Sequence, residues 1–68
     1  MMKVGDLVKV IRDGKNNGHQ NEVGKVYRIL VVSDTLFPPY RLQPDGPYWC
    51  EEDDLQLINF NDYLNQIQ

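Results

Sequence analysis

The chain has 68 residues and a mass of 8.0 kDa, which is enough for one small domain. A domain of this size buries only about 60% of the surface that its unfolded chain exposes, so its hydrophobic core has to be small. This excludes a cofactor-binding α/β enzyme, a helical repeat array and a multidomain arrangement. Val, Leu, Ile and Phe account for 20 of the 68 residues. This share lies above the level of roughly 20% below which disorder is expected, so we expect the chain to fold.

The formal net charge of −3 is unevenly distributed along the chain. Residues 1–44 contain all 7 basic residues and 4 acidic ones, whereas residues 45–68 contain 6 acidic residues and no basic one. The simpler interpretation is a solubilising acidic segment packed beside a mildly basic sheet. The alternative is a two-sided electrostatic surface that orients a partner.

The sequence carries no sign of secretion or of a membrane-spanning helix. Its single cysteine, Cys50, cannot form an intramolecular disulfide. The first ten residues lack the apolar region and the cleavage site of a signal peptide. The longest apolar run, residues 29–32, is far shorter than the roughly 20 residues that a membrane helix needs. We therefore predict a cytoplasmic protein.

Alternating or β-branched apolar residues predict five short strands. The strands are expected over residues 6–12, 25–32, 40–43, 48–50 and 56–58. A polar loop over residues 13–22 separates the first two, and Gly24 suits a bulge or a positive φ before the second. The core is expected to contain Val8, Val10, Val26, Ile29, Val31, Leu42, Trp49, Leu55 and Ile58.

Two helical segments are expected near the C-terminus. The acidic residues 51–55 predict one helical turn before the last strand. In the tail, residues 59–68, apolar side chains at helical spacing predict a short amphipathic helix with Asn59 or Asn61 as its N-cap. The stripe consists of Phe60, Tyr63, Leu64 and Ile67. So short a helix is unstable alone in water, so we expect it to dock on the rest of the chain or on a partner.

The pattern of glycines and valines in the first half resembles the opening of the KOW family of SH3-like barrels. It comprises residues 4–11, Gly18 and residues 23–26. Residues 40–42, 48–49 and 52–58 are similar to the closing strands of small bacterial and phage-encoded SH3-like proteins. The resemblance covers residues 3–58. It implies an all-β, five-stranded SH3-like barrel followed by a short C-terminal helix.

No arrangement of residues typical of a catalytic, cofactor or metal site stands out. His19 and Cys50 are the candidate soft metal ligands, but they lie on different predicted elements. The four consecutive carboxylates of residues 51–54 are typical of a solvated turn rather than of a catalytic pair. Cys50 lies on a predicted strand and is expected to be buried rather than nucleophilic. We therefore predict a protein that is not an enzyme.

Aromatic and apolar residues are the more informative set. We predict a non-enzymatic protein-interaction module, of the kind found among small bacterial or prophage proteins, whose partner contacts an aromatic, loop and tail surface. The candidate contact residues are Tyr27, Phe37, Tyr40, Tyr48, Phe60, Tyr63 and Leu64. The simpler interpretation is that Trp49 and some of the tyrosines fill the core.

The alternative function is a KOW-type RNA- or DNA-binding domain that uses a basic strand face. Its candidate residues are Lys9, Lys25, Arg28 and Arg41, with Tyr27 or Tyr40 as stacking platforms. A third hypothesis is a structural subunit of a larger complex. The sequence leaves the identity of the partner and the oligomeric state open.

Overall fold

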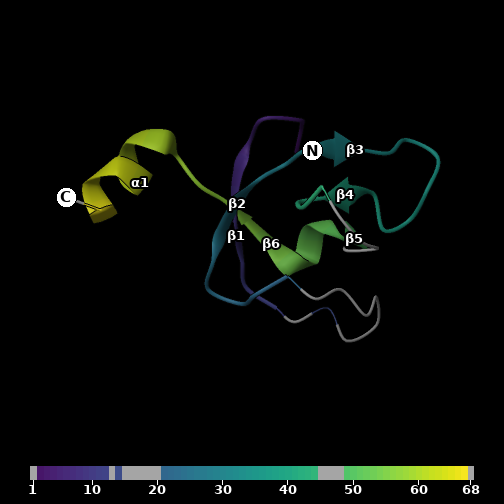
Figure 1. The fold of residues 1–68 in the computed structure, drawn as a ribbon, viewed down its shortest axis with the longest axis horizontal. Coiled ribbons are helices and arrows are strands. Elements are labelled where there is room, and N and C mark those ends of the chain that lie inside the picture. The colour runs from purple at the N-terminus through teal and green to yellow at the C-terminus, as the bar shows by residue number, and fades with distance from the viewer. Residues whose placement is uncertain (1, 13, 15–20, 45–48, 68) are drawn as a thin grey trace.

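Two small antiparallel sheets form the body of the protein (Figure 1). The computed structural model describes residues 2–12, 14, 21–44 and 49–67. The elements within these residues are β1 (Leu7–Val10), β2 (Val26–Arg28), β3 (Val31–Val32), β4 (Tyr40–Arg41), β5 (Trp49–Cys50), the 3-10 helix η1 (Glu52–Asp54), β6 (Leu55–Leu57) and α1 (Phe60–Ile67). The prediction of a mainly β protein is confirmed.

The first sheet has the strand order β2-β1-β6, with β1 in the centre. Val8 pairs with Tyr27 on one side and with Leu57 on the other, and Val10 pairs with Leu55. Because side chains alternate between the two faces of a strand, Val8 and Val10 point inward and are fully buried, while Lys9 points outward. The alternation in the sequence thus predicts correctly which face of β1 is buried.

The second sheet has the order β3-β4-β5. Its central strand brings Tyr40 opposite Val32 on one side and opposite Cys50 on the other. Tyr40 is 3% exposed and Cys50 is fully buried, so the inner face of this sheet carries an aromatic ring and a thiol. The predicted burial of Cys50 is confirmed.

The strand predicted over residues 25–32 is interrupted between the two sheets. The amide of Ile29 donates to the carbonyl of Asp6 at 2.9 Å, and the amide of Leu30 donates to the carbonyl of Arg41 at 2.9 Å. These neighbouring residues therefore bond to different sheets. The interruption shifts the alternation by one residue, so Val31 is 40% exposed and Val32 packs against the core instead. The prediction of Val31 as a core residue is wrong for this reason.

The expected single five-stranded barrel is not closed in the structure. The described residues contain six strands, because the interrupted segment contributes both β2 and β3. They form two separate hydrogen-bonded sheets rather than one continuous barrel.

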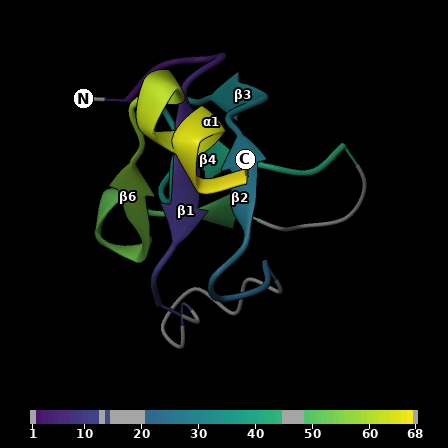
Figure 2. The ribbon, with the colours of Figure 1, turned by 90° about the vertical axis from the view of Figure 1, so that its left-hand side faces the viewer.

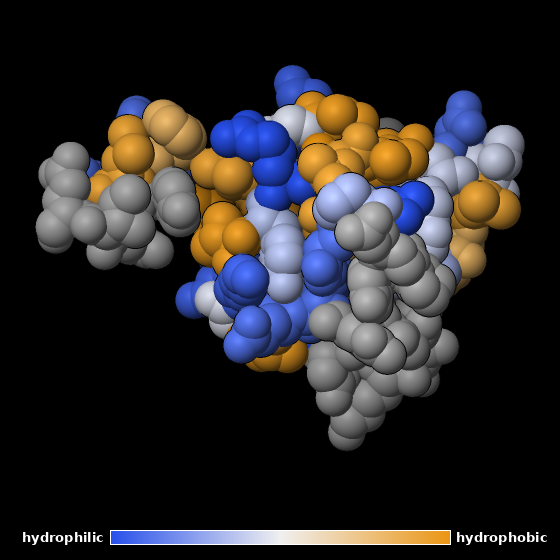
Figure 3. Space-filling view, in the orientation of Figure 1, coloured by the Kyte–Doolittle hydropathy of each residue, from blue (hydrophilic) through white to orange (hydrophobic). Residues whose placement is uncertain are grey.

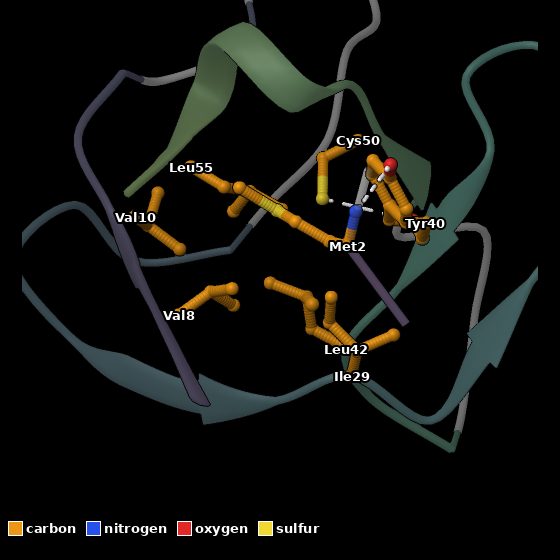
Figure 4. Close-up of a cluster of buried hydrophobic side chains, with 8 residues drawn as sticks. All are labelled: Met2, Val8, Val10, Ile29, Tyr40, Leu42, Cys50 and Leu55. Carbon is orange, nitrogen blue, oxygen red and sulfur yellow. Dashed lines mark hydrogen bonds between the residues drawn. The ribbon is translucent and has the colours of Figure 1, made fainter. Parts of the chain in front are cut away.

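The core lies between the two sheets (Figure 4). Five predicted core residues are confirmed as buried: Val8, Val10, Ile29, Leu42 and Leu55. Val26, Trp49 and Ile58 are only half-buried. Met2 and Tyr40 complete the cluster, and the Met2 side chain extends across it toward Leu55 (Figure 4).

The acidic turn expected over residues 51–55 is confirmed as η1. The Glu51 side chain accepts from the backbone of Asp54, and the Asp54 side chain accepts from the amide of Glu51 at 3.0 Å. This reciprocal capping satisfies amide donors at the start of the helix. η1 therefore leads directly into β6.

The C-terminal segment forms α1, an eight-residue helix. The side-chain oxygen of Asn59 accepts from the amide of Asn61 at 2.8 Å, so Asn59 is the N-cap of the two candidates. α1 stands at one end of an elongated molecule with extents of 36 × 21 × 21 Å (Figure 1). Viewed along the long axis, it lies in front of β1 and β2 (Figure 2).

Candidate functional site

The loop between β3 and β4 presents two large apolar side chains to solvent. Leu36 is 61% exposed and Phe37 is 76% exposed. Phe37 is the most exposed large hydrophobic side chain among the residues described. An exposed aromatic ring on a surface loop has the character of a contact residue, because burying it against a partner contributes more than burying most other side chains. We call Leu36 and Phe37 the loop tip.

Hydrogen bonds at the base of the loop hold the loop tip in place. The hydroxyl oxygen of Ser33 accepts from the amide of Leu36 at 2.9 Å and from the amide of Thr35 at 3.3 Å. The amide of Ser33 donates to the carbonyl of Pro39 at 2.8 Å, which ties the two ends of the loop together. Because these bonds fix the backbone, little conformational entropy would remain to be lost if the loop tip were buried against another molecule. The Phe37–Pro38 peptide bond is cis.

A second apolar site lies at the opposite end of the molecule, on α1. Phe60 is 54% exposed and Leu64 is half-buried, and their i, i+4 spacing places them on the same helix face. Within the described part of the chain, α1 makes no extended contact with a strand or with η1. Figure 3 shows apolar surface at both ends of the long axis, and α1 forms a lobe set apart from the sheets. The structure therefore has two separate exposed apolar sites.

Two of the predicted tyrosines, Tyr27 and Tyr40, do not join either site. Tyr27 is half-buried against the core, and its hydroxyl oxygen accepts from the amide of Glu22 at 3.2 Å. Tyr40 lies inside the core, where its hydroxyl donates to Glu52 at 3.1 Å and accepts from the amide of Met2 at 3.4 Å. Burial raises the pKa of Tyr40. Tyr40 is therefore a core residue, and the simpler interpretation holds for it.

Two further predicted contacts lie outside what the structure describes. Tyr48 falls in the undescribed segment 45–48. Tyr63 belongs to α1, but its side chain is not among those described. His19, the candidate metal ligand, also lies outside the described residues.

The structure divides the predicted basic residues among different places. Lys9 and Arg28 are exposed. Lys9 pairs with Val26, and Arg28 lies two residues after Val26 on β2, so Lys9 and Arg28 share the outer face of the first sheet. The guanidinium of Arg28 donates to the carbonyl of Gly5 at 2.6 Å. Lys25 lies beside Tyr27, with its Nζ 5.4 Å from the ring centre. Two of the four candidates thus share one face.

Arg41 lies on the other sheet and is engaged by its surroundings. Its guanidinium donates to the carbonyl of Gln43 at 3.0 Å and to that of Pro44 at 2.7 Å. The same group lies 6.0 Å from the ring centre of Trp49. These contacts fix the chain after β4 and make Arg41 a structural residue of that corner.

A cluster of ion pairs joins the end of β1 to η1. The sequence patterns do not predict this cluster. The Nε of Arg12 donates to Asp54 at 2.7 Å, and its Nη2 donates to Glu51 at 2.6 Å. These hydrogen bonds raise the pKa of Arg12. Asp54 is fully buried, so the pairing is what allows a carboxylate inside this fold. The partners are far apart in the sequence, and no local pattern predicts their contact.

Cys50 is held as a protonated thiol. Its Sγ donates to the carbonyl of Tyr40 at 3.6 Å. Burial, and then the charge of Asp54, raise the pKa of Cys50 to about 12. Because the thiolate is the nucleophilic form, this position disfavours nucleophilic chemistry at neutral pH. Among the residues that the structure describes, no three His, Cys, Asp or Glu side chains converge to hold a metal ion.

No protein-family profile, curated protein or solved structure matches the chain. The resemblance to SH3-like barrels consequently rests on the residues and on the strand order alone. Within the described residues, no helix is both long enough and apolar enough to cross a bilayer.

Proposed function

We propose that this chain is a cytoplasmic, non-enzymatic protein-interaction module of bacterial or phage origin. The loop tip, Leu36 and Phe37, is its first contact site, and α1 is the second. The observation that carries the proposal is the 76% exposure of Phe37 on a loop whose base is hydrogen-bonded. Burying one such side chain contributes about 1.5–3 kcal/mol, which corresponds to a change in Kd of roughly tenfold to hundredfold.

We also propose that the two sheets are the halves of an SH3-like barrel. If β2 and β3 are counted as one bent strand, the chain has five strands in the predicted order. The short helix η1 stands immediately before the last strand, as the resemblance implies. A central strand in each sheet and a shared core between them are consistent with the two halves of a small barrel.

Affinity capture with single-site variants tests the loop tip. The tagged chain and the variant Phe37→Ser would be used to capture proteins from the source cell, and the bound partner would be quantified. Val23→Ser is the matched control, because Val23 is 54% exposed but belongs to neither contact site. We expect Phe37→Ser to lose at least about tenfold of the captured partner, corresponding to about 1.4 kcal/mol. Equal capture by both variants would show that the loop tip is not the contact site.

The alternative function, binding of RNA or DNA, is favoured by one observation: Lys9 and Arg28 share the outer face of the first sheet. A nucleic-acid column at low salt tests it, because phosphate contacts weaken steeply as salt rises. Salt-dependent retention that is lost in Lys9→Gln and kept in Lys3→Gln would support this function. If the wild-type chain passes through the column without retention at low salt, nucleic-acid binding is excluded as its function.

A further inference from the structure

We draw no further inference here: the strongest candidate, the apolar face of α1 with the exposed Phe60 and the half-buried Leu64, carries none because nothing in the part of the chain that the structure describes shows what covers it.

Discussion

At the scale of single residues, Asp54 shows how this small fold accommodates a buried charge. Its side chain accepts from Arg12 at 2.7 Å and from the amide of Glu51 at 3.0 Å. Its backbone carbonyl accepts from the amide of Ile11 at 2.9 Å. A buried carboxylate is tolerated when its oxygens are paired and hydrogen-bonded, and here the pairing also fastens η1 to the end of β1.

Asp54→Ala should therefore lower the free energy of unfolding by about 1–3 kcal/mol, because it removes a buried hydrogen-bond acceptor and leaves its donors unpaired. Urea unfolding measures this change. Asp53→Ala is the matched control, since Asp53 is an exposed acid on the same turn and should change the free energy by no more than about 0.5 kcal/mol. Equal losses in the two variants would argue against the buried pairing.

Cys50 gives the protein a predictable dependence on alkaline pH. Its pKa rises from 9.0 to about 12 on folding, so between these values the unfolded chain loses a proton that the folded chain keeps. The free energy of unfolding should therefore fall as pH rises above about 9, at up to about 1.4 kcal/mol per pH unit. Urea unfolding at several pH values measures the slope. Cys50→Ala should reduce the slope, and the raised pKa of Tyr40 should account for part of the remainder.

At the scale of elements, the turn before β2 depends on a glycine. Gly24 has a φ of +90°, and its amide donates to the carbonyl of Val10 at 2.8 Å. Space around the position is open, so a side chain there would meet backbone strain rather than a steric clash. The sequence suggests a bulge or a positive φ at Gly24, and the structure has the positive φ.

Gly24→Ala should accordingly lower the free energy of unfolding by about 1–2 kcal/mol. Gly24→Asn should cost less, because asparagine adopts positive φ more readily than alanine does. Thermal or urea unfolding of the two variants gives the comparison. If alanine and asparagine were equally harmful, a clash rather than backbone strain would be the cause.

At the scale of the whole molecule, the two apolar sites lie at opposite ends of the long axis (Figure 1). Among the side chains that the structure describes, the core between the sheets contains none from α1. The body should thus be able to fold without its C-terminal helix.

A chain ending at Ile58 should therefore keep its fold at low protein concentration. We expect its free energy of unfolding at about 1 μM to differ from that of the full chain by less than about 1 kcal/mol, because the helix adds no described side chain to the core. Circular dichroism and urea unfolding measure this. A truncated chain that fails to fold would mean that α1 stabilises the rest of the chain.

Much of the local structure of this chain could be predicted from short-range patterns. Alternation correctly gives the buried face of β1, and the acidic run gives η1 before the last strand. The apolar spacing in the tail predicts a helix over the residues that form α1, with Asn59 as one of two candidate caps. Each of these features depends on residues within a few positions of one another, which is why the sequence carries them.

Contacts between distant segments could be decided only by the tertiary structure. The interruption after Ile29 depends on two carbonyls, that of Asp6 just before β1 and that of Arg41 in β4. The same arrangement buries Tyr40, leaves Phe37 exposed and brings Arg12 to Asp54. The sequence by itself determined the buried face of β1, the turn glycine and the helical tail, because local sterics and periodicity act over a few residues. The tertiary structure alone decided which aromatic residues face solvent, because burial depends on which distant segments pack together.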